Sequence, residues 1–160
     1  MNRKYNTTEF LACVERLRRY FPGCALTADM ITGFPGETEA DQAAAVAFLE
    51  QVGFAAVHVF PYSRRPGTKA DAMPEQLSHA VKSARAHEAQ RVADGCKQRY
   101  LAQQVGRILP VLFETEHDGN WVGHSDNYCL VRAAGDDLRG LVKNVKISAV
   151  SGQMLVGDLV

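Results

Sequence analysis

The chain has 160 residues, of which 46% are hydrophobic and 22% are charged, a composition that fits a globular chain of one or two domains. Its 18 basic and 18 acidic residues cancel, so the total charge gives no evidence of a nucleic-acid or membrane partner, although a local patch could still bind phosphate. No apolar run approaches the ~20 residues that span a bilayer, and the first residues lack the apolar region of a signal peptide. We therefore expect a chain that works in the cytoplasm without membrane contact.

The cysteines are scattered along the chain and form no CxxC pair. They are Cys13, Cys24, Cys96 and Cys129. This spacing does not supply the ligands of a self-contained iron–sulfur or structural zinc site. We expect small buried or half-buried thiols.

Helical and strand patterns alternate over residues 1–63. Asn6 could cap a first helix, whose apolar residues recur at helical spacing. A strand at about 25–32 follows, then a helix that Thr38 could cap, and then a second strand at 54–60. This rhythm predicts parallel βα units.

The loop after the first strand is the most informative stretch, because ligands of parallel α/β folds bind where the strand ends meet the next helix. Asp29 interrupts the apolar strand just before a glycine-rich turn. A carboxylate in an apolar run costs free energy unless it has a partner, so Asp29 suggests a buried hydrogen-bond network or a bound ligand. The alternative is that Asp29 only caps local backbone.

The loop after the second strand, residues 61–68, contains two prolines and a glycine. Tyr62, Arg64 and Arg65 come together there, so the loop is either a solvated exit loop or a rim that contacts an anion or a nucleotide. His58, in the strand before it, is expected to be a core imidazole with satisfied hydrogen bonds.

Residues 75–104 are predicted to form one long charged helix, a pattern that usually belongs to a solvated face or a linker. Five short strand-like runs separated by turn residues follow, which predicts a small closed or nearly closed β-barrel. Asp118-Gly119 is a good hairpin turn, and Pro110 suggests an edge or a bulge. The runs are 107–115, 121–124, 128–132, 141–148 and 154–156.

Small barrels of this kind commonly bind oligonucleotides through one strand face and its loops. Lysine and arginine for phosphate contacts, with aromatic rings for stacking, are the residues that RNA binding needs. The barrel region has a basic scatter of Arg107, Arg132, Lys143 and Lys146. Trp121, His124, Asn127 and Tyr128 lie near them in the sequence. A lone Trp and Tyr in so small a barrel are more often core residues, and both alternatives stay open.

Four motifs in order, MNRKY, TADMITGFPGET, HVFPYSRRPGT and a terminal region containing GHSDNY, together resemble the radical-SAM methylthiotransferases. The terminal barrel looks like their TRAM domain. The sequence HVFPYS looks most like the branch that methylthiolates threonylcarbamoyladenosine next to the anticodon of tRNA.

The resemblance implies an α/β plus all-β fold. Residues 1–74 would be the distal part of a radical-SAM partial βα (TIM-like) barrel, 75–104 a linking helix, and 105–160 a five-stranded, OB-like TRAM domain. The family also has an N-terminal domain and a CxxxCxxC loop that holds a 4Fe-4S cluster, and this sequence contains neither.

We therefore expect the C-terminal part of such an enzyme. By itself this chain would be inactive, because it lacks the cysteines that bind the cluster. The alternatives are a non-catalytic RNA-binding module and an inactive fragment. Because two βα units leave parallel strand edges unpaired, we expect residues 1–70 to be loosely folded or to pair at these edges with a homodimer partner or the missing N-terminal half. We expect residues 105–160 to fold independently.

The resemblance also implies specific residue roles. Arg3 and Asp29 would contact the methionine and ribose parts of S-adenosylmethionine, Ile31 and Gly33 the adenine, and the backbone around Pro61 and Tyr62 would close the pocket. The residues expected to hold tRNA are Arg64, Arg65, Lys97, Arg99, Arg107, Asn127, Tyr128, Arg132, Lys143 and Lys146.

Overall fold

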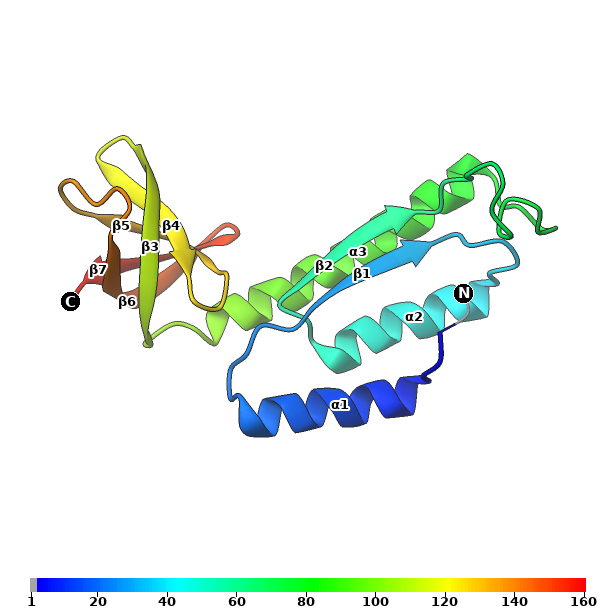
Figure 1. Ribbon diagram of the computed structural model, residues 1–160, viewed down its shortest axis with the longest axis horizontal. Coiled ribbons are helices and arrows are strands. Elements are labelled where there is room, and N and C mark those ends of the chain that lie inside the picture. The colour runs from blue at the N-terminus through cyan, green and yellow to red at the C-terminus, as the bar shows by residue number, and fades with distance from the viewer. Residues whose placement is uncertain (1–2) are drawn as a thin grey trace. The chain divides into compact units, whose positions relative to one another are not determined.

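The computed structural model describes residues 3–160 of the chain. They divide into two compact units, one up to Cys96 and one from Lys97 to Val160, and Figure 1 labels the elements of both. The boundary falls inside the longest helix, α3 (His79–Ala102). An α/β part is thus followed by a five-stranded β part, which confirms the fold class at this level.

The first unit consists of α1 (Thr7–Tyr20), β1 (Thr27–Thr32), α2 (Glu39–Val52), β2 (Ala56–Pro61) and most of α3. Both predicted helix starts are confirmed. The Asn6 side chain accepts the N–H of Glu9, whose own side chain accepts the N–H of Asn6, and Thr38 and Asp41 form the same reciprocal arrangement. Each arrangement satisfies two N–H groups that a helix start leaves without an intrahelical partner.

β1 and β2 form a two-stranded parallel sheet with Asp29 opposite His58 and Ile31 opposite Phe60. Alternate residues of the strands point to opposite faces. Ala28, Met30, Val57 and Val59 belong to a core built with residues of α1, α2 and α3. The three helices therefore cover one face of the sheet.

The other face of the sheet is open, which contradicts the buried hydrogen-bond network suggested for Asp29 and the core position predicted for His58, and leaves the bound-ligand alternative for Asp29 untested. Asp29 is exposed, so the free-energy argument that it needs a buried partner does not apply. His58 is also exposed and stacks on Phe60, with 6.5 Å between the ring centroids, so it is not a core imidazole. Both errors have one cause, since a strand with helices on a single face buries only every second side chain.

The predicted long helix begins four residues later than expected. Glu75 has a φ of +59°, which a right-handed helix does not allow. Ser78 then accepts the N–H of Val81 through its hydroxyl, and α3 begins at the next residue. The helix also buries Lys82 and Arg85, so the side that carries them is not a solvated face.

The second unit contains a closed barrel with the strand order β3-β4-β5-β7-β6. All neighbouring pairs are antiparallel except β5 and β7. Its interior holds Val111, Phe113, Val131, Val145 and Leu155, which are all fully buried. The strands are β3 (Ile108–His117), β4 (Asn120–Ser125), β5 (Leu130–Ala134), β6 (Val142–Ser151) and β7 (Met154–Leu159).

Two local predictions for the barrel have different outcomes. Asp118 and Gly119 join β3 to β4 with φ values of +53° and +73°, which confirms the hairpin turn. Pro110 is not on an edge, because β3 pairs with β4 and with β6, and the irregularity lies between Phe113 and Thr115. The strand tolerates the proline because pairing with β4 begins only at the next residue.

Candidate functional site

The open face of the β1-β2 sheet forms one wall of a cavity of about 650 Å³. This volume lies within the range of small-molecule sites. Residues from both strands and from the loop after β2 line it, together with one residue from the start of the chain. They are Arg3, Asp29, Ile31, Phe60, Pro61, Tyr62, Ser63, Arg65, Thr68 and Ala70.

Five of the six residues predicted to bind the cofactor lie together in this lining: Arg3, Asp29, Ile31, Pro61 and Tyr62. Gly33 is not among the lining residues. It makes a turn at a φ of +71° directly after β1, so its predicted contact with adenine stays a prediction.

The loop after β2 separates its two arginines. Arg65 lines the cavity, whereas the Arg64 side chain pairs with Asp71, with 2.7 Å between Nε and Oδ1, and also donates to the Asp71 carbonyl. We predicted both as RNA contacts. Phe60 was not predicted for the site, although its position opposite Ile31 in parallel register follows once the two strands are paired.

The cavity combines two guanidinium groups, one carboxylate and an apolar wall. A guanidinium pairs well with a carboxylate, Asp29 can accept hydrogen bonds from hydroxyl groups, and Ile31 and Phe60 offer a surface for a flat ring. Such a lining suits a ligand with an anionic end, a hydroxylated middle and an aromatic end.

The Tyr62 ring is held on two sides. It meets Phe34 edge-on at 5.2 Å between centroids, and the Lys82 ammonium lies 5.0 Å from its centroid, a cation–π arrangement. The Tyr62 hydroxyl is buried and has no hydrogen-bond partner among the described residues. Sequence reasoning missed Lys82, because the charged composition of α3 gives no sign of which side chains point inward.

The cysteines do not fit an iron–sulfur cluster. Cys13 is exposed, Cys24 is half-buried, and Cys96 and Cys129 are buried. Over residues 3–160 no group of three or more His, Cys, Asp or Glu side chains could hold a metal ion.

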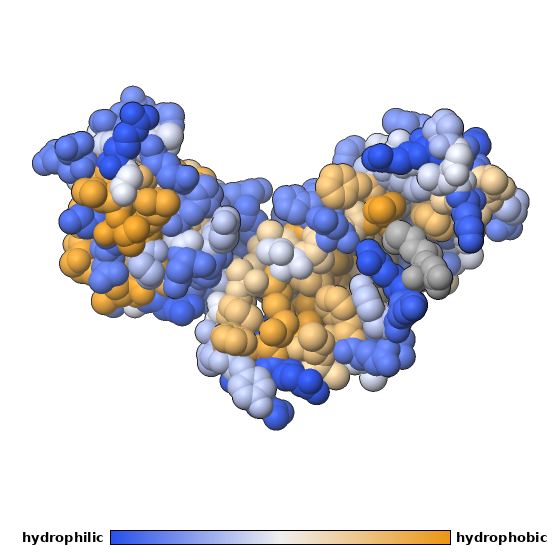
Figure 2. All heavy atoms as spheres, viewed as in Figure 1, coloured by the Kyte–Doolittle hydropathy of each residue, from blue (hydrophilic) through white to orange (hydrophobic). Residues whose placement is uncertain are grey.

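The outer face of the barrel combines apolar and basic side chains. Leu112 of β3 lies opposite Val142 of β6 on one side and His124 of β4 on the other, and Ile108 lies opposite Lys146. Directly opposed residues point to the same face, and all five are exposed. Figure 2 shows apolar residues among hydrophilic ones on the surface of this unit.

The loop between β4 and β5 presents an aromatic ring to solvent. Tyr128 is 85% exposed and has a φ of +60°, a strained backbone conformation for a residue other than glycine. Its ring lies 6.0 Å from that of His124, whose Nδ1 lies 2.6 Å from a Glu114 carboxylate oxygen. Trp121, in contrast, is buried in the barrel, so the core alternative holds for the Trp and fails for the Tyr.

A network of side-chain hydrogen bonds holds the loop between β4 and β5 in place. Asn127 donates to the Tyr100 hydroxyl and to the Gln104 side chain, both at 3.1 Å. The Ser125 hydroxyl donates to the Asn127 side-chain oxygen at 2.6 Å, and the Ser125 carbonyl accepts the N–H of Tyr128. These bonds hold Tyr128 in its strained conformation.

The other residues of this unit that were predicted to bind RNA differ in their contacts. Arg107 donates to Gln104 at 2.6 Å, and Lys97 donates to Gln153 at 2.9 Å. Arg99 and Lys143 are exposed, and Arg132 is half-buried on β5 opposite Val122. Asn127 supports the loop by the contacts described above.

Known proteins resemble this chain over almost its whole length, although no protein-family model matches it. The threonylcarbamoyladenosine tRNA methylthiotransferase MtaB of Bacillus subtilis is 37% identical over 153 residues, which is 92% of this chain and 34% of that protein. The tRNA-2-methylthio-N(6)-dimethylallyladenosine synthase of Maricaulis maris is 40% identical over 162 residues, which is 99% of this chain and 36% of that protein. The chain is homologous to the tRNA methylthiotransferases.

A synthase of the second kind from Nitratidesulfovibrio vulgaris is 35% identical and is matched over 37% of its length. The chain thus spans about a third of the length of each of these methylthiotransferases. The resemblance stated from the four motifs is confirmed. Among the described helices, none is long and apolar enough to cross a membrane.

Proposed function

We propose that this chain is the C-terminal part of a tRNA methylthiotransferase, in which the α/β unit orients S-adenosylmethionine and the barrel holds tRNA. The observation that carries the proposal is the cavity on the open sheet face, whose lining contains five residues predicted from the sequence for this cofactor. Those five residues are spread over about 60 positions of the chain, and only the parallel pairing of β1 with β2 brings most of them together.

The chemistry of the lining fits S-adenosylmethionine group by group. The Arg3 guanidinium would pair with the carboxylate of the methionine part, and the Asp29 carboxylate would accept from the ribose hydroxyls. Ile31 and Phe60 would lie against the adenine, and the backbone at Pro61 and Tyr62 would close the cavity. These residues bind and orient, and they exclude water from the apolar end.

In the family, S-adenosylmethionine bound next to a reduced 4Fe-4S cluster supplies radical chemistry, which is a property of the cofactors rather than of the protein side chains. Ligands for such a cluster are not found in residues 3–160, so we assign them to a part of the enzyme outside this chain. We expect this chain alone not to methylthiolate RNA.

The same proposal accounts for the unpaired edges of the sheet. Among the residues that the structure describes, β1 pairs only with β2, which leaves one edge of each strand open. We propose that the α/β unit is the distal part of a radical-SAM partial βα barrel and that the N-terminal half of the enzyme, or else a second copy of the chain, covers these edges. The helix would then link this unit to a TRAM domain at residues 105–160.

We propose threonylcarbamoyladenosine next to the anticodon as the modified base, from the motif HVFPYS. The overall identities of 37% and 40% do not separate this branch from the dimethylallyladenosine branch. A cytoplasmic location follows from the proposal, because tRNA is the partner. Anticodon stem-loops carrying either modified adenosine, compared in one binding assay, test the choice.

The first experiment measures cofactor binding by titrating the chain with S-adenosylhomocysteine in a calorimeter. The change Asp29→Asn keeps the shape of the side chain but removes the charge, and we expect it to weaken binding about tenfold, which is ~1.4 kcal/mol. Asp136→Asn, the same change at an exposed position of the other unit, is the matched control and should bind like the wild type. Equal binding by both variants would refute the assigned role of Asp29.

The second experiment measures tRNA binding by filter retention at a series of salt concentrations. Removal of the charge in Lys146→Ala should weaken binding to all tRNAs and reduce the slope of log K against log salt by about 0.7–0.9. Glu116→Gln, in β3, which pairs with the β6 strand of Lys146, changes charge in the opposite direction and should not reduce the slope. Binding of tRNA without binding of S-adenosylhomocysteine would favour the RNA-binding module, and binding of neither would favour an inactive fragment.

A further inference from the structure

The turn that follows β1 is closed by its own carboxylate. The Glu37 side chain accepts the N–H of Gly33 at 2.9 Å and that of Phe34 at 3.4 Å. Within the turn, the N–H of Glu37 donates to the Phe34 carbonyl at 2.9 Å. Gly33 follows Thr32, the last residue of β1, so this carboxylate fixes the direction in which the chain leaves the cavity wall.

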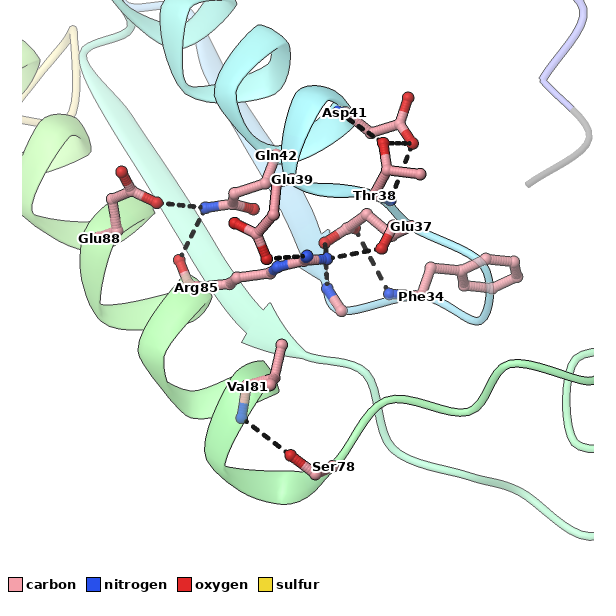
Figure 3. Close-up of polar contacts among 11 residues, drawn as sticks. Phe34, Glu37, Thr38, Glu39, Asp41, Gln42, Ser78, Val81, Arg85 and Glu88 are labelled. Carbon is pink, nitrogen blue, oxygen red and sulfur yellow. Dashed lines mark hydrogen bonds and ion pairs between the residues drawn. The ribbon is translucent and has the colours of Figure 1, made fainter.

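Arg85 of α3 holds that carboxylate from a distance of 48 residues along the chain. Its Nη1 donates to Glu37 Oε1 at 2.7 Å and to the Glu37 carbonyl at 2.9 Å, and its Nη2 donates to Glu39 Oε1 at 2.7 Å. Figure 3 shows the guanidinium between the two carboxylates. The Arg85 side chain is 7% exposed and that of Glu37 is 16% exposed, whereas that of Glu39 is 89% exposed. The pair with Glu37 is therefore the one that is shielded from water and salt.

The backbone of Arg85 is held as well. The amide of Gln42 in α2, which is buried, donates to the Arg85 carbonyl at 3.1 Å and to a Glu88 carboxylate oxygen at 3.0 Å, as Figure 3 also shows. The Nε of Arg85 is buried without a hydrogen-bond partner among the described residues. A buried unpaired donor is unfavourable, so the contacts with Glu37 and Glu39, and not full satisfaction of its own donors, hold this side chain in place.

Lys82, one helical turn before Arg85, reaches the same region. A Cβ atom built on Gly33 would lie 2.6 Å from Lys82 Cγ, so the lysine stem packs directly over that residue. Its ammonium faces the ring of Tyr62, which lines the cavity. Residues three apart lie on one face of a helix, and here that face contacts the chain just after β1 and just after β2.

We propose that Arg85 is a positioning residue for the cavity: through Glu37 it fixes the turn at Gly33 and thereby the wall formed by Asp29 and Ile31. It touches no ligand itself. The proposal goes beyond the function proposed above, and it rests on that function only where S-adenosylhomocysteine is used as the probe.

The test compares Arg85→Lys, which keeps the charge but loses the two-pronged geometry, with Arg91→Lys, the same change at an exposed position of α3. The first readout is hydrogen exchange at the Gly33 amide, together with the NMR shift of the Ile31 methyl groups, both in the absence of ligand. We expect Arg85→Lys to speed exchange at Gly33 at least tenfold and to move the Ile31 signals, because Glu37 would lose the charge-assisted hydrogen bond that holds its carboxylate at the Gly33 N–H. The control should change neither.

The second readout is the affinity for S-adenosylhomocysteine, which should fall about tenfold in Arg85→Lys. The double variant Glu37→Gln with Arg85→Lys should lose no more affinity than either single variant, since coupled residues are not additive. A change that merely destabilises the fold would instead add to the effect of Glu37→Gln and would speed exchange throughout the unit.

The outcomes separate this proposal from the proposed function. If Arg85→Lys leaves Gly33 exchange and the Ile31 signals unchanged, or leaves a measurable wild-type affinity unchanged, the positioning role is overturned and the proposed function stands. If the wild type binds no S-adenosylhomocysteine, the proposed function fails, and the Gly33 and Ile31 readouts alone decide the positioning role.

Discussion

Replacement of Gly33 by alanine should strongly destabilise the α/β unit, for two separable reasons. Gly33 has a φ of +71°, where a residue with a Cβ atom costs about 1–2 kcal/mol. The new Cβ would also lie 2.6 Å from Cγ, 3.1 Å from Cβ and 3.2 Å from Cα of Lys82. The side-chain end of Lys82 can rotate away, but its Cα is part of α3, so the helix itself must shift.

Gly67 separates the two contributions. It has a φ of +82°, and a Cβ atom there would meet nothing within 4 Å. Gly67→Ala should therefore cost only the backbone term of about 1–2 kcal/mol. Gly33→Ala adds overpacking, which typically costs about 1–3 kcal/mol, so we expect about 2–5 kcal/mol in all.

The assay is urea unfolding followed by two signals. Far-UV circular dichroism is dominated by helix, and most helical residues lie in the α/β unit. Trp121 is the only tryptophan of the sequence and is buried in the barrel, so its fluorescence reports the other unit. Gly33→Ala should lower the midpoint of the dichroism transition and leave the fluorescence transition in place.

A double-mutant cycle identifies the clash. Lys82→Ala removes the Cγ atom but leaves the Cβ contact at 3.1 Å, so the cost of Gly33→Ala should become smaller in that background without disappearing. The reasoning is refuted if Gly33→Ala and Gly67→Ala cost the same, or if Lys82→Ala gives no relief.

Three further predictions concern the barrel and the thiols. Tyr128→Gly should stabilise the barrel by about 1 kcal/mol in urea unfolding, since glycine accepts the positive φ. The same change should weaken tRNA binding by about 1–3 kcal/mol, because a stacking ring is lost. Unchanged tRNA affinity would remove Tyr128 from the RNA surface. Gly123→Ala should abolish the cooperative fluorescence transition, because the added Cβ would overlap the Leu112 carbonyl oxygen across the β3-β4 pair. A native-like transition would contradict this prediction and show that the two strands can separate locally. Burial raises the pKa of the Cys129 thiol. At mildly alkaline pH, iodoacetamide should therefore modify the exposed Cys13 first and Cys129 only in urea, as measured by peptide mass spectrometry. Equal modification rates of the two thiols would contradict the burial of Cys129.

The parts of the fold that depend on neighbouring residues were predictable from the sequence. The caps at Asn6 and Thr38 each need only a partner three residues away, and the Asp118-Gly119 turn needs only two residues that tolerate a positive φ. Turn signals at short, regular spacing were likewise enough to predict five strands and a barrel. In each case the information is local, so tertiary structure does not override it.

The candidate site was only partly predictable, because its residues are selected by the open face of the sheet. Asp29 was singled out for the wrong reason, as an acid in a buried run, and it lies on the exposed face instead. Its place in the cavity lining therefore follows from strand alternation together with helices on one side only. Phe60 lacked any signal of its own, because an aromatic residue in a strand is usually read as core.

Arg85 and Lys82 show a different limit on what the sequence alone can predict. Their helix has charged residues on all sides, and such a pattern predicts a solvated surface, but both side chains are buried against the turn after β1. Long side chains can bury their stems while their charged groups stay paired. Periodicity alone cannot distinguish such residues from surface charges, and only the parallel pairing and the packing of α3 identify them.

The late start of α3 has a physical reason in the turn that follows β1. Glu75 lies in the left-handed region, which costs on the order of 1–3 kcal/mol for a residue other than glycine, and its carbonyl accepts the N–H of Gly36 at 3.2 Å. A helix that began at Glu75, as the sequence predicts, would direct that carbonyl along its own axis and leave the Gly36 N–H without this partner. The turn after β1 is thus held by Arg85 from within α3 and by Glu75 from the segment before it. Glu75→Gly should therefore relieve the strain without loosening the turn, whereas Glu75→Pro, whose φ is fixed near −65°, should disrupt it and speed exchange at the Gly36 amide.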